Sequence, residues 1–461
     1  MTSTEPSKPA PARDVVPLRE AVKAWFAISL QTFGGPAGQI AVMQRHLVDE
    51  RRWIGQHRFL HALNYCMLLP GPEAQQLAIY VGWLLNGVPG GLIAGSLFVL
   101  PGLLALLVLS AVYVGFGDTT VVTALFAGLA PAVVAVVAQA VWRVGTRALR
   151  NGVLVGFAVT AFVALAVFAV PFPVVVAAAA VAGWLLHRWR PTLITAGGGH
   201  QADGDQPTPL IRDDALHHDQ PSARRAAVIL TVGLLAWFAP VALVAATGIG
   251  SIYTEQGLFF SGTAVITFGG AYAVLAHVAQ RAVEDYGWLS ATDMVRGLAL
   301  AESTPGPLIM VVQFVAFLGA YHHPGVLDPW TAGVVASLLT CWVTFVPCFL
   351  FILLGAPYVE RLRGNKALSA ALTGITAAVV GVIANLGLYF AVHTLFASSH
   401  TVTSGPLQLE LPDLGDVRAI PWLIAATAAI LIFKLRWSVL RVLGMSAALG
   451  LAAGLAGLPV A

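Results

Sequence analysis

Two glutamates flank paired Pro-Gly-Pro turns inside otherwise apolar segments, and they are the residues best placed for chemistry. Glu73 directly follows Pro70-Gly71-Pro72, where the N-terminus of a helix would stabilise an ionised carboxylate. Glu302 stands three residues before Pro305, at the C-terminal end of a helix, where negative charge is disfavoured. Glu302 is therefore the better candidate for reversible protonation, whereas Glu73 could equally be a simple N-terminal cap.

Glycine and proline also break two further apolar segments, at Gly34-Gly35-Pro36 and at Gly269-Gly270. A half-helix that begins at such a break offers unpaired backbone N–H groups and a positive dipole end, which favour anions. The breaks could instead be kinks that serve packing, and the polar side chains near them could form bonds between helices. The candidate substrate-binding residues are Gly34, Gly35, Gln39, Asn64, Pro70, Gly71, Pro72, Glu73, Gln75, Gln76, Gly269, Gly270, Tyr272, Glu302, Thr304, Pro305, Gly306 and Pro307.

No metal, cofactor or catalytic motif accompanies these residues. The three cysteines, Cys66, Cys341 and Cys348, lie inside apolar runs without a CxxC pair or a cluster of His and Asp. The sequence contains no HExxH or GxSxG motif. We therefore expect no metal site, no cofactor and no catalytic residue, and we treat an intramembrane enzyme as the weaker interpretation.

The composition excludes a water-soluble globular protein. Of the 461 residues, 58% are hydrophobic and 10% are charged, whereas a soluble domain carries roughly 25% charged residues. The net charge of +3 is too small to indicate a nucleic-acid surface. An all-α polytopic membrane protein is the fold class that this composition predicts.

Apolar stretches predict where the helices lie. Uninterrupted stretches of about 20 residues, enough to cross a ~30 Å hydrocarbon core, occur at 91–116, 121–142, 152–169, 172–187, 226–248, 330–355, 367–396, 419–433 and 438–458. Each half of a broken segment has about 12 to 14 residues, or roughly 20 Å, which is too short to cross alone. Whether the broken segments span or re-enter is open at this stage.

The breaks also reveal an internal repeat. Three landmarks recur 235 residues later in one register, namely Phe33 as Phe268, Trp53 as Trp288 and Pro70 as Pro305. Gly128 and Val133 recur 246 residues later as Gly374 and Val379, which indicates an insertion around residues 322–329. The chain is thus predicted to be a duplication.

The repeat divides the chain into five parts. We expect a disordered tail at 1–16, a first repeat at 17–190, a cytoplasmic linker at 191–225, a connecting transmembrane helix at 226–250 and a second repeat at 251–461. One extra crossing between the repeats makes them inverted, as in many transporters. The positions of Lys and Arg place the N-terminus and the linker in the cytoplasm, and an odd number of plain helices places the C-terminus outside.

The motifs at the breaks resemble those of the chromate ion transporter family. The resemblance rests on Phe33-Gly34-Gly35-Pro36 with Gln39, Leu63-Asn64-Tyr65-Cys66, Pro70-Gly71-Pro72-Glu73-Ala74-Gln75-Gln76, Gly82-Trp83, the run from Thr267 to Leu275, and Glu302-Ser303-Thr304-Pro305-Gly306-Pro307-Leu308. These motifs span both halves, and Ser303 stands where the family pattern has Thr. A long-chain, two-domain member is what this resemblance implies.

The resemblance implies a transporter of the inner membrane that exports chromate, driven by the membrane potential or the proton-motive force, and so confers chromate resistance. The expected partners are chromate, sulfate as a competing analogue, and membrane lipid, with no nucleic acid; a homodimer is left open. A sulfate-type oxyanion carrier and a non-transporting membrane scaffold are the alternatives. Sequence does not set the preference between chromate and sulfate, because the two anions share charge and shape.

Overall fold

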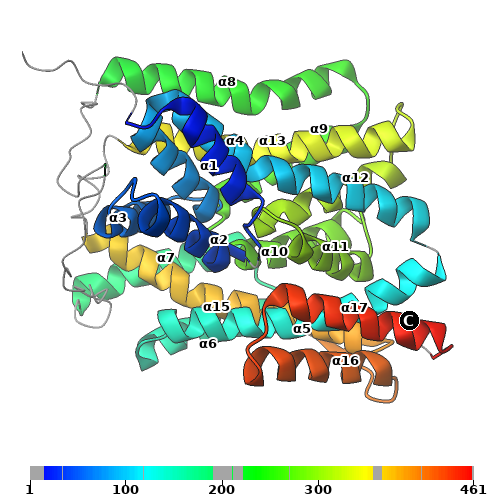
Figure 1. The fold of residues 1–461 in the computed structure, drawn as a ribbon. Helices are drawn as coiled ribbons and strands as arrows, with labels where there is room; N and C mark the ends of the chain where they lie inside the picture. The colour runs from blue at the N-terminus through cyan, green and yellow to red at the C-terminus, as the bar shows by residue number, and fades with distance from the viewer. Residues whose placement is uncertain are drawn as a thin grey trace, which may run out of the picture.

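The computed structural model describes residues 15–33, 35–117, 119–190, 210, 222–268, 270–356, 366–405 and 407–458. Six of the described helices are long and apolar enough to cross a membrane. Apart from one two-stranded sheet, the described elements are helices (Figure 1). The predicted all-α polytopic membrane protein is confirmed.

The helices follow the predicted order in both halves. The first half contains α1 (Leu18–Ser29), α2 (Gly35–Gln44), the π-helix η1 (Arg45–Glu50), α3 (Gln56–Cys66), α4 (Glu73–Phe116), α5 (Thr120–Ala148), α6 (Gly152–Ala166) and α7 (Phe172–Trp189). After α8 (Ala223–Thr247) come α9 (Ser251–Ile266), α10 (Ala271–Gln280), the π-helix η3 (Arg281–Asp285), α11 (Ala291–Ser303), the 3-10 helix η4 (Leu308–Met310), α12 (Val311–His322) and α13 (Pro329–Gly355). The chain ends with α15 (Lys366–Leu395), β1 (Ser399–Ser404), β2 (Leu407–Pro412), α16 (Ala419–Ala429), the π-helix η6 (Ile430–Lys434) and α17 (Val439–Leu455). Each predicted apolar stretch is helical over most of its length, and each predicted break separates two helices.

Helix α4 folds back on itself. Its backbone leaves the helical region at Asn86 and at Gly87, where φ is +63°. Close contacts of Gly82 with Gly90, and of Ile79 with Gly91, place residues 73–86 antiparallel to the part of α4 that follows the kink. In the second half, separate helices α12 and α13 take the place of these two parts, and residues 323–328 join them. The insertion predicted around 322–329 falls at this joint.

Six helices form a layer, called here the scaffold layer, in which the two halves interlock: α5, α6, α7, α15, α16 and α17 (Figure 1). Helix α5 packs against α17, and α15 packs against α7. A Cβ on Gly128 would lie 2.0 Å from the carbonyl oxygen of Ser446, and one on Gly374 would lie 2.5 Å from that of Ala179. Glycine is therefore what allows these helix pairs to approach so closely.

A β-hairpin between α15 and α16 was not predicted from the sequence. Strands β1 and β2 pair antiparallel, with Ser399 opposite Pro412. The backbone N–H of Gln408 donates to the carbonyl of Val167 at 2.8 Å, and Glu410 pairs with His393 at 3.2 Å. The hairpin could not be recognised from the sequence, because the strands are short and their side chains are mostly exposed.

The structure describes parts of two segments at the predicted domain boundaries. Val15 and Val16, which we expected in the tail, are held against α4: Val15 N–H donates to Leu85 O at 3.0 Å, and Asn86 Nδ2 donates to Val16 O at 2.6 Å. Residues 1–14 and most of the predicted linker lie outside the described residues. Leu210 of the linker donates its N–H to Arg52 O at 3.1 Å, and α8 begins at Ala223 rather than at 226.

Candidate functional site

Each of the four breaks contains a glycine with a positive φ. The angles are +75° at Gly35, +105° at Gly270, +115° at Gly71 and +103° at Gly306. Residues with a Cβ rarely adopt such angles, so the backbone itself requires glycine at these turns. The neighbouring candidates Gly34 and Gly269 lie outside the described residues.

The breaks are joined crosswise between the halves. Gly71 N–H donates to Thr267 O at 2.8 Å, and Gly306 N–H donates to Thr32 O at 2.9 Å. The two donors are 235 residues apart, and so are the two acceptors. The second break therefore meets the third, and the first meets the fourth, which gathers the ends of the half-helices in one region.

These bonds correct one expectation about the turns. We expected free N–H groups at the breaks, but the N–H groups of Gly71 and Gly306 are already bonded to carbonyls. Two of the candidate glutamines also hold the turns, because Gln39 Nε2 donates to Gly306 O at 2.6 Å and Gln76 Nε2 donates to Pro70 O at 2.6 Å. The chain thus satisfies much of its own non-helical backbone.

Gln75 is the candidate glutamine whose side chain is still available. It is fully buried on the first turns of α4, yet neither Nε2 nor Oε1 has a hydrogen-bond partner among the described residues. Gln76 Oε1 is likewise unpaired in that part of the chain. A buried amide without partners costs about 1–3 kcal/mol, which a bound polar ligand or water offsets.

The two glutamates lie in different surroundings. Glu73 begins α4 and is partly exposed, and its Oε1 is 3.8 Å from where a Cβ on Gly270 would lie. Glu302 is buried and accepts a hydrogen bond from the hydroxyl of Tyr272. Glu73 of the first half thus faces a break of the second half, whereas Glu302 is held by a neutral hydroxyl from its own half.

The other candidates shape the turns or lie outside this region. Pro72 and Pro307 occupy the N-cap positions of α4 and η4, and Thr304 Oγ1 donates to Ala301 O at 3.0 Å at the end of α11. Asn64 lies on an exposed face of α3, and the structure does not join it to the crosswise bonds.

Sequence analysis missed one pair of residues that support the turns. A Cβ on Gly102 would lie 2.4 Å from Pro305 O, and a Cβ on Gly71 would lie 3.0 Å from Cys348 Sγ. Gly102 and Cys348 are 246 residues apart, the second displacement of the repeat. Helix α4 of the first half therefore packs on the Pro-Gly-Pro turn of the second half, and α13 of the second half packs on that of the first. The matching pairs Pro101-Gly102 and Pro347-Cys348 were the available signal.

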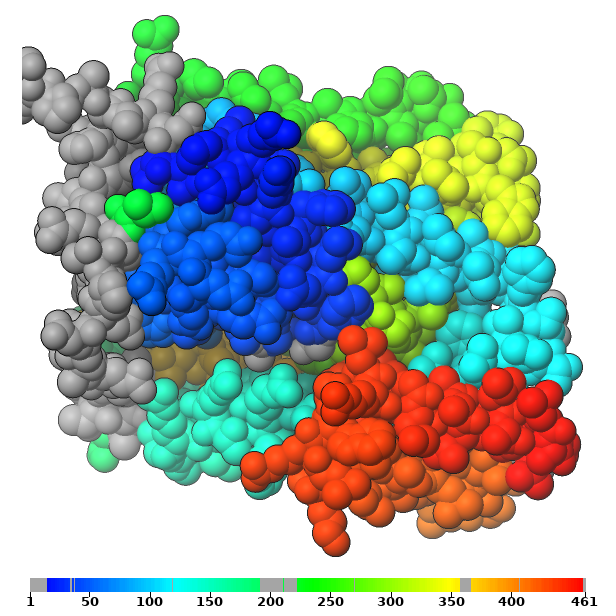
Figure 2. Space-filling model, in the orientation of Figure 1, coloured from blue at the N-terminus to red at the C-terminus, as the bar shows by residue number. Residues whose placement is uncertain are grey.

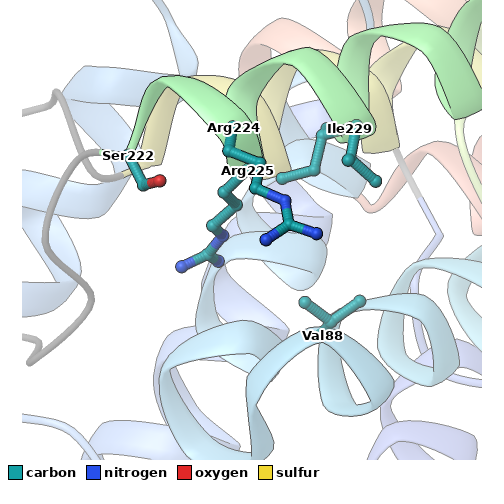
Figure 3. A pocket seen from close by; sticks show the side chains of 6 residues that line it. Val88, Ser222, Arg224, Arg225 and Ile229 are labelled. Atoms are coloured by element: carbon teal, nitrogen blue, oxygen red, sulfur yellow. The ribbon is translucent and has the colours of Figure 1, made fainter.

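A surface pocket lies at the start of α8, away from the candidate residues. It is lined by Val88, Ser222, Arg224, Arg225, Val228 and Ile229 (Figure 3). None of these belongs to a break, so this pocket is not the candidate site. Among the described residues there is also no group of His, Cys, Asp and Glu that could hold a metal ion.

Comparison with known proteins identifies the family. The family model described as chromate transporter matches residues 19–184 and again residues 254–454, once in each half. A chromate transport protein of Pseudomonas aeruginosa is 31% identical over 365 residues, which are 78% of this chain and 77% of the relative. One of Cupriavidus metallidurans is 28% identical over 371 residues, 79% of this chain and 80% of the relative.

A shorter relative matches only part of the chain. The uncharacterized transporter YwrA of Bacillus subtilis is 30% identical over 127 residues, which are 28% of this chain but 71% of that protein. A protein about the size of one repeat is therefore similar to part of this chain. No solved structure is significantly similar to the chain.

Proposed function

Because the chain belongs to the chromate transporter family, we propose that it exports chromate, a tetrahedral dianion, through the region where the four breaks meet. The observation that carries this proposal is the reciprocal pair of bonds from Gly71 to Thr267 and from Gly306 to Thr32. Non-helical backbone at membrane depth is tolerated where protein buries it or where it lines a water-filled cavity. The unpaired amide of Gln75 and the partly exposed Glu73 favour a polar path at this place.

Contacts at the two ends of α8 support an inverted arrangement of the repeats. Val88, just after the kink of α4, lines the pocket at the start of α8 (Figure 3). Val326, in the corresponding joint of the second half, donates its N–H to Ile249 O just beyond the end of α8 at 3.1 Å. Helix α8 has 25 residues and is therefore about 37 Å long. Corresponding joints thus lie at opposite ends of a helix long enough to span the membrane.

The distribution of Lys and Arg sets the orientation that we propose for the protein in the inner membrane. The N-terminus and the α7–α8 linker are cytoplasmic, and the C-terminus is external. In agreement with this, α8 starts at the left of Figure 1, whereas the C-terminus lies at the right. Reporter fusions at Gly198 and Ala461 should report opposite sides of the membrane, and the same side for both would overturn the inverted arrangement.

The membrane potential is sufficient to drive export. Moving one charge through 100 mV is worth about 2.3 kcal/mol, so a dianion that leaves a cell with a negative interior gains about 4.6 kcal/mol. This corresponds to a gradient of roughly 2000-fold. Protonation of Glu302 beside the anion would strengthen anion binding, which couples proton and anion in the same direction and not in exchange. Glu302 therefore tunes affinity with pH, and export needs no obligate proton antiport.

Transport by purified protein in liposomes tests this function. A potassium–valinomycin potential at equal pH on both sides should drive labelled chromate, and Glu302→Gln should keep this response while its pH dependence becomes flat. Protein that moves neither chromate nor sulfate would be a scaffold, and protein that moves sulfate but not chromate would be a sulfate-type carrier. A wild type that ignores the potential and responds only to a pH gradient would replace the electrical mechanism with proton exchange.

A further inference from the structure

Arg143 lies deeper in the protein than its sequence position indicates. The apolar run that precedes it ends at residue 142, yet α5 continues to Ala148. Helix α5 crosses α15 here: a Cβ on Gly387 would lie 3.3 Å from Val137, and one on Gly145 would lie 3.5 Å from Val380. Val380 is halfway along α15, so Arg143, two residues before Gly145, lies beside the middle of a spanning helix.

Arg143 belongs to the helix that packs on α11 beside the buried pair of Glu302 and Tyr272. Helix α5 packs against α11, which carries Glu302. The charge of Arg143 acts electrostatically on both Glu302 and Tyr272, and these two residues are joined by a hydrogen bond. Among the described residues, Tyr272 on α10 and Arg143 on α5 are the titratable groups whose charge or hydrogen bond influences Glu302. The arginine is thus near the candidate site although it belongs to the scaffold layer.

Three arginines on the broken segments have polar partners, unlike Arg143 on α5. Arg281 pairs with Asp285, Arg296 donates to the hydroxyl of Tyr113 at 3.1 Å, and Arg45 lies 3.6 Å from Glu50. Arg143 is only partly exposed, and its guanidinium makes no hydrogen bond or salt bridge to any residue that the structure describes. An unpaired charge at membrane depth is costly and usually marks a substrate path.

We propose that Arg143 binds the transported oxyanion and that the carboxylate of Glu302 competes with that anion for its charge. The inference rests on the proposed transport of a tetrahedral dianion. The planar guanidinium donates two parallel hydrogen bonds to two oxygens of the anion, a geometry that an ammonium group lacks. Protonation of Glu302 by the proton pool of the solution removes the competing negative charge and so strengthens the binding of the anion. When Glu302 is ionised, its negative charge instead attracts the guanidinium and weakens the binding of the anion.

Binding to the purified full-length protein tests this assignment. Equilibrium binding of labelled chromate, and separately of sulfate, is compared between wild type, Arg143→Gln, Arg143→Lys and Arg147→Gln. Arg147 is the matched control because it lies one turn further along the same helix and is exposed. We expect Arg143→Gln to weaken binding by about 10- to 100-fold, from the loss of hydrogen bonds to a charged group. Arg143→Lys should bind with intermediate affinity, and Arg147→Gln should stay within about twofold of wild type.

The pH dependence separates a binding role from a structural one. Wild-type affinity should fall as the pH rises and Glu302 ionises, whereas both Glu302→Gln and Arg143→Gln should lose this dependence. Equal affinity in Arg143→Gln and Arg147→Gln would overturn the inference while leaving the transport function intact. A wild type that binds neither chromate nor sulfate would instead overturn the proposed function, and the inference with it.

Discussion

The two halves of the molecule contain the same hairpin in two different surroundings. The first hairpin comprises α2, η1 and α3, and the second comprises α10, η3 and α11. Both bend in the same way: Trp53 N–H donates to Leu47 O and Trp288 N–H donates to Ala282 O, each at 2.8 Å. The local backbone of the two hairpins is therefore equivalent.

The hairpins differ in what covers them. Helix α11 packs against α5, α15 and α17, whereas α3 packs mainly against α4. Leu60 on α3 is 39% exposed and its counterpart Val295 on α11 is 1% exposed; Met67 is 55% exposed and its counterpart Glu302 is 2% exposed. Figure 2 shows a recessed band between the first hairpin (blue) and α6 (teal). Only the second hairpin is closed against the scaffold layer.

This difference shows how a duplicated chain can have one open side. Transporters with inverted repeats alternate by moving one element against another around a fixed site. With the proposed orientation, we infer that the exposed face of α3 opens toward the cytoplasmic side. In the opposite state we expect the exposed face of α3 to pack on the scaffold layer as α11 does now.

The largest effect is expected at the glycine turns that follow the two hairpins. Gly71→Leu and Gly306→Leu should each reduce transport by more than about 100-fold, because a positive φ strains any residue with a Cβ. The control is Gly156→Leu, since Gly156 has nothing within 4 Å of a Cβ. Transport into vesicles is measured at equal amounts of inserted protein. Normal rates in both turn variants would mean that the turns only shape the packing.

Accessibility of the two hairpins should differ by at least about tenfold if the chain opens on one side at a time, as alternating access requires. Leu60→Cys should react quickly with a membrane-impermeant maleimide from the cytoplasmic side, and Val295→Cys should react slowly. The native Cys66, Cys341 and Cys348 are buried and give a low background. Equal rates would contradict the asymmetry, and reaction of Leu60→Cys with a lipid-soluble maleimide alone would show that this face of α3 contacts lipid.

The scaffold layer, in contrast to the hairpins, should respond equally in both halves. Gly128→Val and Gly374→Val each force a side chain against a backbone carbonyl of the neighbouring helix. We expect each to cost about 1–3 kcal/mol of stability by overpacking. Thermal unfolding in detergent measures the loss, with Gly262→Val as the control because nothing lies within 4 Å there. A large loss in one variant alone would mean that the asymmetry extends into the scaffold layer.

Features that leave a local trace were predictable from the sequence, whereas those that depend on tertiary packing were not. The breaks were predictable because Gly71 and Gly306 must adopt a positive φ between two prolines. The bond from Gly306 to Thr32 was not, since it joins residues far apart in the chain. The depth of Arg143 was not predictable either, because the apolar run stops at residue 142. The different exposure of the two hairpins was not predictable, because the Gly, Pro and Trp pattern is the same in both repeats.

The smallest effect is expected in the loop of residues 323–328, which joins α12 to α13 and has no equivalent in the first half. Asp328 caps α13 there by accepting from Trp330 N–H at 3.2 Å and Thr331 N–H at 3.1 Å. Hydrogen bonds from the side chain and then the backbone of Thr331 hold the pKa of Asp328 below its ordinary value of 3.8. A lowered pKa of an acid stabilises the folded protein above the ordinary value, and this contribution is lost as the pH falls through the lowered one.

Asp328→Ala should therefore lower the Tm by about one degree at pH 7, and the difference from wild type should become smaller once the pH is well below 3.8, because only the charge-dependent part of the cap is lost. Asp328→Asn keeps a neutral cap, so it should retain most of the stability but show no such pH dependence. The kink at Asn86 and Gly87 occupies the corresponding place in the first half without an acidic cap. A difference between wild type and Asp328→Ala that persists unchanged at low pH would mean that the aspartate acts through its shape and not through its charge.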